Sequence, residues 1–408
     1  MGIASYYAER VQDMPTALKH CEVSRSLAQS SGNYERQAEA VVRFAHIKWS
    51  VGEYTIGQAY AKEAQRLAKI SGYLDRESRG LYYEALCLQA LGNYRDCISL
   101  TIRARALLDL CGMSHGDISY VIMNCQAEVH KVKSEYEEAL AIQNEVLKAA
   151  LSAHHPYQHA VALANTAELE VLMGVASDVI QKKIDTSRAV FQRPGHPALL
   201  VSACDWIQAD LNLREGDGSS VLLCRCLREV QQKDTEIAGH CLERLADTTR
   251  WGGLDHPSSW SIIFLVHSLK TKRKLDIYKS LQFIGDIFLK ENDEVTALNL
   301  FMLALEGFIS MDVHQSRAEC ILRIGDMSKR NGYLLKAFEL WEAARPLFER
   351  SLQAVRVQDI DERLAAISND VKEQYRNNLA QLATLNAPVG KVQIDGHNVA
   401  SEEEALLV

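Results

Sequence analysis

The chain of 408 residues contains only seven prolines and nine phenylalanines. It also lacks stretches in which Val, Ile and Thr alternate with polar residues, which is the pattern of a half-buried strand. Ala, Leu, Glu, Lys, Arg and Gln, the residues that favour helices, are abundant instead. These absences exclude a β-rich fold and predict an all-α protein.

An excess of positive charge and a long apolar segment are both missing. The 45 basic residues are outnumbered by 53 acidic ones, and the resulting net charge of -8 disfavours binding to nucleic-acid phosphates. No uninterrupted apolar run approaches the roughly 18 residues that a membrane helix requires, and no signal peptide opens the chain. We therefore expect a cytoplasmic protein whose partners include neither nucleic acid nor a membrane.

The ten cysteines do not form the dense framework of a small secreted domain, so we expect reduced thiols. Cys224, Cys226, His240 and Cys241 form the only cluster of cysteines that resembles a metal site. In a Cys-x-Cys pair on a helix, however, the two thiols point about 200° apart. The cysteines are better explained as core residues.

A second group of possible metal ligands is His154, His155 and His159. Pro156 interrupts this group and is better explained as the first residue of a helix, with His155 as the neighbour of its cap. The same His-Pro pair recurs in the next predicted repeat, at His196 and Pro197. We expect no bound metal.

Catalytic signatures are absent as well. The sequence has no Gly-x-x-x-x-Gly-Lys phosphate loop, no His-Glu-x-x-His, no Gly-x-Ser-x-Gly and no Gly-rich dinucleotide fingerprint. We expect no enzymatic activity, no catalytic residue and no cofactor.

What the sequence does contain is an internal repeat with a period of about 40 residues, a length typical of helical repeats. Gly32, Gly72 and Gly112 each follow a helical stretch, at the place where glycine adopts the left-handed conformation that ends a helix. The same spacing relates Leu27, Leu67 and Leu107, Gly52 and Gly92, Tyr54 and Tyr94, and Ala64 and Ala104. So many coincidences predict one supersecondary unit used repeatedly.

The clearest two units lie near the C-terminus. Leu281, Ile284, Gly285, Asp286, Ala297, Phe301, Ala304 and Phe308 match Ile321, Ile324, Gly325, Asp326, Ala337, Trp341, Ala344 and Phe348, and every pair is separated by the same period. We expect Gly285 and Gly325 to lie where two helices approach closely, because a bulky side chain there would separate them.

These small and aromatic positions resemble the tetratricopeptide repeat. His155, Pro156, Ala160, Leu163, Asn165 and Ala167 are similar to the repeat start of the longer units in kinesin light chains. The resemblance implies an α-solenoid, a right-handed superhelix of about eight helix pairs, whose first helices line a concave groove.

Three parts of the chain are distinguished. Residues 1–351 are predicted to form the repeat array, with an incomplete first repeat, and residues 352–386 a C-terminal capping helix. Residues 387–408 lack periodicity and are predicted to be disordered. The stretch from Ala344 to Ala366 is similar to the C-terminal arrays of fungal signalling NTPases.

Projection of the helical period onto the first helices selects polar and aromatic residues for the groove. They are Arg43, His46, Trp49, Tyr82, Tyr83, Asn124, Glu128, Asn165, Glu168, Trp206, Asp210, Arg244, Asp247, Arg323 and Lys329. The peptide-contacting set is predicted to be Arg43, Tyr83, Asn124, Asn165, Arg244 and Arg323.

Two of these residue types suggest how a ligand would be held. Asn124 and Asn165 occupy the same place in adjacent repeats, and Asn165 matches an asparagine that kinesin-light-chain repeats turn toward peptide. Arg244 and Arg323 are expected to attract acidic side chains. The predicted function is a scaffold that binds a peptide or helical segment of a partner protein. The alternative is a sensor array of a NACHT- or NB-ARC-like signalling NTPase, acting within one chain or as a split partner.

Overall fold

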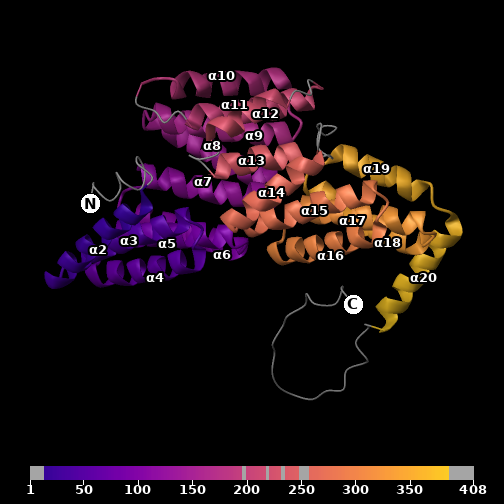
Figure 1. The fold of residues 1–408 in the computed structure, drawn as a ribbon, viewed down its shortest axis with the longest axis horizontal. Helices are drawn as coiled ribbons and strands as arrows, with labels where there is room; N and C mark the ends of the chain where they lie inside the picture. Colours follow the sequence, from indigo (N-terminus) through magenta and orange to yellow (C-terminus); the bar gives the residue numbers. More distant parts are fainter. Residues whose placement is uncertain (1–12, 195–198, 217–219, 231–234, 248–256, 386–408) are drawn as a thin grey trace, which may run out of the picture.

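The computed structural model describes residues 13–194, 199–216, 220–230, 235–247 and 257–385. Over these residues the chain forms nineteen helices and no strand (Figure 1). The prediction of an all-α fold is confirmed. The predicted disordered tail at 387–408 and the His-Pro pair at 196–197 lie outside the described residues, as does the start of the incomplete first repeat.

The helices follow one another as antiparallel neighbours, beginning with α2 (Met14–Ser30). Eight pairs come next: α3 (Tyr34–Ser50) with α4 (Tyr54–Ser71), α5 (Leu74–Ala90) with α6 (Tyr94–Leu110), α7 (Asp117–Val132) with α8 (Tyr136–Ser152), α9 (Pro156–Leu172) with α10 (Ser177–Phe191), α11 (Leu199–Arg214) with α12 (Val221–Val230), α13 (Thr235–Ala246) with α14 (Pro257–Thr271), α15 (Lys274–Lys290) with α16 (Glu294–Met311), and α17 (His314–Arg330) with α18 (Leu334–Arg350). The predicted stack of about eight helix pairs is confirmed.

The repeated glycines end helices as expected. Gly32, Gly72 and Gly112 have φ values of +66°, +73° and +73°, in the left-handed region. After Gly32 and Gly72 the next helix begins two residues later, whereas a longer turn separates Gly112 from α7. After Gly32 the Asn33 side chain caps α3 by accepting a hydrogen bond from the Arg36 amide at 2.9 Å. Short left-handed turns therefore keep successive helices antiparallel.

Gly285 and Gly325 lie at helix-helix contacts, as the sequence predicts. A Cβ atom on Gly285 would lie 2.7 Å from the Phe301 ring, and one on Gly325 would lie 2.7 Å from Trp341 Nε1. Both aromatic side chains are fully buried. The match between the two units thus reflects one contact, in which an aromatic ring fills the space that the missing side chain leaves.

The C-terminal cap differs from the prediction. In place of one capping helix over 352–386, the structure has α19 (Ala354–Ala365) and α20 (Asn369–Leu385), and both pack on α18. The break follows from Ile367, which is buried in the core of this end. Ser368 and Asn369, which come next, are residue types that favour a helix start.

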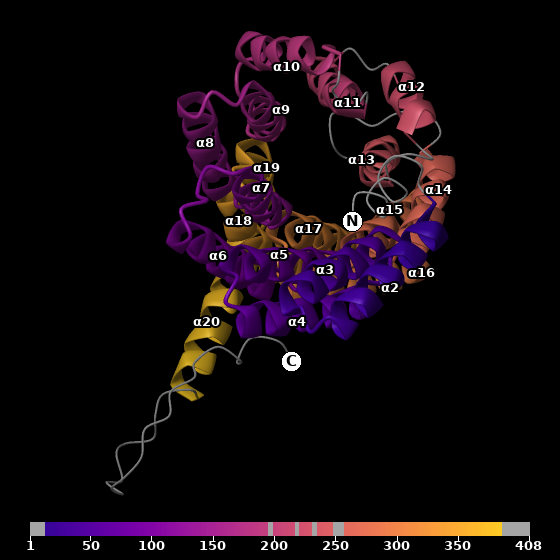
Figure 2. The same ribbon diagram turned by 90° about the vertical axis from the view of Figure 1, so that its left-hand side faces the viewer.

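The solenoid turns far enough to meet itself. Figure 2 shows α7 to α14 as an arch, and the N-terminal pairs lie beside the later pairs in both views. The Tyr54 hydroxyl, at the start of α4, donates to the Thr271 carbonyl at 2.7 Å, 217 residues away. Ala85 and Tyr94 share one core cluster with Phe308 and Met311. Successive turns of the solenoid are therefore in contact, and we call this closed arrangement the ring.

A network of charges joins the two sides of this ring, and we call it the clasp: Lys133, Glu135, Asp312, His314 and Arg350. Lys133 Nζ lies 2.8 Å from Glu135 and 2.9 Å from Asp312, and Arg350 lies 3.0 Å from Glu135. The carboxylates and His314 have the spacing of metal ligands. The Lys133 ammonium already lies against both carboxylates and supplies the positive charge that a metal would bring.

Helix α16 is the one described helix that is long and apolar enough to cross a membrane, with a mean hydropathy of 1.4. Thr296, Asn299 and Glu306 interrupt its apolar residues, so the sequence shows no unbroken apolar run there. In the structure α16 packs between α15 and α17 and buries Ala297, Phe301 and Ala304. Its outer face is apolar too, since Val295 and Met302 are exposed.

Candidate ligand cavity

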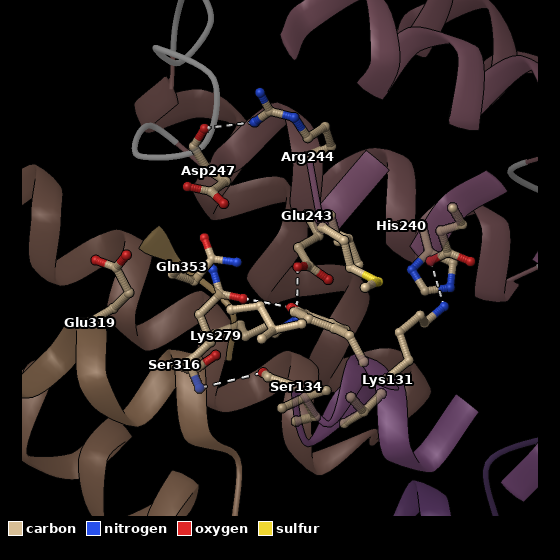
Figure 3. Close-up of a pocket in the computed structure, with 18 of the residues that line it drawn as sticks. Lys131, Ser134, His240, Glu243, Arg244, Asp247, Lys279, Ser316, Glu319 and Gln353 are labelled. Carbon is tan, nitrogen blue, oxygen red and sulfur yellow. Dashed lines mark hydrogen bonds and ion pairs between the residues drawn. The ribbon is translucent and has the colours of Figure 1, made fainter. Parts of the chain in front are cut away.

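A cavity of about 620 Å³ lies on the concave side of the ring (Figure 3). Six successive first helices, α7, α9, α11, α13, α15 and α17, and the cap helix α19 contribute to its wall. Its charged and aromatic lining residues include Glu128, Lys131, Glu168, Trp206, His240, Glu243, Arg244, Asp247, Arg273, Asp276, Lys279, Glu319, Arg356 and Asp359. The prediction that first helices line the concave face is confirmed for this part of the array.

On the side of α7 and α9, two carboxylates share one ammonium group. Lys131 Nζ lies 2.6 Å from Glu128 and 2.5 Å from Glu168. Burial raises the pKa of Glu168 to about 7. The negative charges of Glu128 and Asp210 also raise this pKa, whereas the positive charge of Lys131 lowers it. Near neutral pH this wall therefore holds a carboxyl group that is partly protonated.

An aromatic surface follows on α11 and α13. The Trp206 and His240 rings stack with centroids 5.2 Å apart and an interplanar angle of 12°. Burial lowers the pKa of His240 to about 3, and the positive charge of Lys131 contributes to the shift. His240 is therefore neutral at physiological pH and acts as a flat ring beside the acidic wall.

On α13 and α15 one carboxylate has a close cationic partner and the other has a more distant one. Lys279 Nζ lies 2.7 Å from Glu243, and Figure 3 shows these two side chains meeting across the cavity wall. The ion-pair partner of Asp276 is Arg273, whose Nε atom lies farther away, at 3.7 Å. Burial raises the pKa of Asp276, and the Glu243 charge adds to that effect against the attraction of Arg273.

The two arginines predicted for the groove are not available to a ligand. Arg244 is the one predicted peptide-contacting residue that lines the cavity, and its Nε atom lies 2.7 Å from Asp210. Arg323 is 8% exposed, and its guanidinium lies 2.5 Å from Asp286 and 2.7 Å from Glu319. The expectation that they attract acidic ligand groups is corrected, because their charge is already neutralised inside the protein.

The two asparagines meet, although outside the cavity lining. Asn165 Nδ2 donates to Asn124 Oδ1 at 3.4 Å, and Gln143 Nε2 donates to the same oxygen at 3.2 Å. Equivalent positions in adjacent repeats therefore do stack, one turn before Glu128 and Glu168. Their role toward a ligand stays a prediction.

The N-terminal part of the predicted groove is occupied by other helices of the ring. Tyr83 packs with Tyr82, ring centroids 5.1 Å apart, against the core cluster shared with α15 to α17. Arg43 is half-buried on α3 and does not line the cavity. A groove that runs along all repeats is thus corrected to a cavity that begins at α7.

Several residues that line the cavity were not predicted from the sequence to face the groove. The main ones are Lys131, His240, Glu243, Arg273, Asp276 and Lys279. His240 shares a helix face with Arg244 at a spacing of four and with Glu243 at a spacing of three, so the projection of α13 was incomplete. Arg273 lies in the turn between α14 and α15, a loop in which no helical projection applies.

Comparisons with known proteins address the fold. No family model matches the chain, and no curated protein matches it. Among solved structures, a Rap protein complexed with Competence and Sporulation Factor is similar at a TM-score of 0.50 and 9% identity, over 84% of this chain and 99% of that chain. This chain has the fold of a helical repeat protein.

A circular tandem repeat protein with a novel repeat topology and enhanced subunit contact surfaces also aligns, over 91% of this chain and 92% of that one. Its TM-score of 0.22 at 12% identity is too low to support an argument. The finer likenesses, to kinesin light chains and to the arrays of fungal signalling NTPases, stay predictions.

Proposed function

We propose that this protein binds a segment of a partner protein in the cavity and performs no catalysis of its own. The observation that carries the proposal is that six successive first helices and the cap helix α19 converge on one cavity of about 620 Å³. Concave surfaces with a few placed polar and aromatic groups are typical binding sites of helical repeat proteins. The Rap protein of similar fold is itself complexed with a factor, which supports a binding role.

The test is to select peptides from a displayed library on the wild-type protein and to measure their affinities for a variant with a blocked cavity. Ser316 lines the cavity on α17, so Ser316→Trp would fill part of it. The matched control is Ser152→Trp on α8, where the serine is exposed. We expect the block to weaken binding at least roughly tenfold, a loss of about 1.4 kcal/mol, and the control to leave it unchanged. Equal affinities for the two variants would refute the proposal.

A signalling NTPase as the partner remains a second proposal that rests on the sequence resemblance alone. It is distinguished by adding a purified NTPase domain as a competitor for the selected peptides. Competition that Ser316→Trp abolishes would support it, whereas no competition at any concentration would exclude that domain.

A further inference from the structure

Acidic residues outnumber basic residues in the cavity lining. Seven carboxylates line it: Glu128, Glu168, Glu243, Asp247, Asp276, Glu319 and Asp359. Five cationic residues line it: Lys131, Arg244, Arg273, Lys279 and Arg356. Arg244 and Arg273 also pair with Asp210 and Glu236, which lie outside the lining. Arg323 and Arg363, which also lie outside the lining, pair in turn with the lining carboxylates Glu319 and Asp359. Two outside acids and two outside arginines offset each other, so the excess of carboxylates over cations in the lining remains.

Two carboxylates show where this excess is located. The side chain of Asp276 is 9% exposed, and within the described part of the chain it accepts no hydrogen bond, with Arg273 Nε at 3.7 Å as its ion-pair partner. On α7, Glu128 Oε1 is buried without a hydrogen-bond partner among the described residues. A buried carboxylate oxygen that lacks a donor is costly. A ligand that brings donors and positive charge would relieve this cost at Glu128 and would give Asp276 a closer partner than Arg273.

We propose that the cavity recognises a basic peptide segment, and that Glu128, Glu168 and Asp276 bind its arginine side chains. This inference rests on the proposed function and names the chemistry of its ligand. Arginine fits better than lysine because its planar guanidinium pairs with carboxylates and stacks on aromatic faces. The stacked Trp206 and His240 rings lie on the same wall as Glu168 and offer such a face.

Binding of a cation is linked to proton release. Glu168 faces Lys131, Glu128, Asp210 and His240, and its pKa of about 7 leaves it partly protonated at neutral pH. A bound guanidinium lowers that pKa, because a nearby positive charge favours the ionised carboxylate. The heat of binding should then depend on the ionisation enthalpy of the buffer near pH 7, and this dependence should vanish in Glu168→Gln.

The experiment uses fluorescein-labelled peptides of equal length that contain arginine, lysine, glutamate or only neutral residues, with fluorescence anisotropy as the readout. We expect the arginine peptide to bind most tightly and to weaken with added salt. Glu168→Gln and Asp276→Asn should each weaken it roughly tenfold, as loss of a charge-assisted contact does. Glu138→Gln and Glu306→Gln are matched controls, because these glutamates are exposed on the outer helices α8 and α16. Thermal melts of all variants verify folding.

The outcomes separate this inference from the proposed function. Equal loss of arginine-peptide affinity in the cavity and control variants would mean a nonspecific charge effect and would overturn the inference. If neutral or acidic peptides bind in a way that Ser316→Trp abolishes and the arginine peptide does not bind, the inference is wrong and the proposed function stands. If no peptide responds to Ser316→Trp, both are wrong.

Discussion

Acidic and basic side chains pair between successive first helices at a nearly constant spacing along the chain. The pairs are Glu243 with Lys279, Asp286 with Arg323, Glu319 with Arg356, and Asp326 with Arg363. In each pair the opposite charge takes the place of water. Removal of one partner alone therefore destabilises the fold, even where the whole pair contributes little to the free energy of unfolding. The arginines on the concave face therefore hold adjacent repeats together.

Replacement of Arg323 by methionine keeps most of its volume and leaves Asp286 and Glu319 without their shared cation. We expect the free energy of unfolding to fall by about 3–5 kcal/mol, as for other broken buried pairs. The measurement is urea denaturation followed by circular dichroism. Arg330→Met is the control, since this arginine is exposed and its pair with Glu294 is worth at most about 1 kcal/mol. Equal losses for the two variants would contradict the burial of Arg323.

At the scale of the helix pair, close contact between the two helices depends on glycines, which have no side chain. Gly285 admits the Phe301 ring between α15 and α16, and Gly307 admits the Tyr278 ring in the same pair. The two rings enter from opposite helices, so the helices interlock. Glycine is tolerated inside these helices although it disfavours them, because close approach buries the Phe301 ring fully and the Tyr278 ring in part.

Two glycines inside helices should respond oppositely to the same substitution. Gly285→Ala places a methyl group 2.7 Å from Phe301, so we expect a loss of about 1–3 kcal/mol from overpacking. Gly239→Ala on α13 meets its nearest neighbour, His267, at 3.4 Å, an ordinary contact. It should be neutral or stabilising by up to about 1 kcal/mol, because alanine favours helix. Melting temperatures compare the two; a larger loss at Gly239 would contradict this packing.

At the scale of the whole molecule, the decisive feature is closure of the ring. Gly92 lies against Met311, and Gly52 lies against the Thr271 carbonyl, so two turns of the solenoid touch at the ends of helices. The clasp adds ion pairs between the turn after α7 and the turn after α16. Closure converts an open groove into a cavity and excludes the N-terminal first helices from it.

The clasp predicts a pH-dependent contribution to stability. Burial alone would raise the pKa of Glu135, but hydrogen bonds with His130 and Lys133, together with the nearby His314 ring, outweigh it and hold this pKa well below its ordinary value. A carboxyl with a lowered pKa stabilises the fold fully above its unfolded pKa, and the contribution is lost as the pH falls toward the folded pKa.

We therefore expect Glu135→Gln to lower the free energy of unfolding by about 3–5 kcal/mol near neutral pH. The difference from wild type should shrink as the pH falls below about 4.3, the ordinary pKa of glutamate. Denaturation at a series of pH values measures it. Glu137→Gln, at an exposed position of α8, should change stability by less than about 0.5 kcal/mol. A difference that grows on acidification would show that the clasp does not hold Glu135 ionised.

Part of the cavity was accessible to sequence reasoning. Glu128, Glu168, Trp206, Arg244 and Asp247 were projected onto the concave face and do line the cavity. The projection did not distinguish residues that face the cavity from those that pair across helices, because both lie on one helical face. Which arginine is neutralised depends on an acidic residue in a neighbouring repeat.

What the sequence by itself determined is everything that recurs with the period of the helix pair. Helix ends at Gly32 and Gly72, and the contacts of Gly285 with Phe301 and Gly325 with Trp341, depend on neighbours close in the chain, so a periodic pattern records them. The tertiary structure alone decided that the array closes on itself. Closure follows from a small rotation at each helix pair that accumulates over the array. It brings together residues such as Lys133 and Asp312, whose wide separation no local repeat encodes.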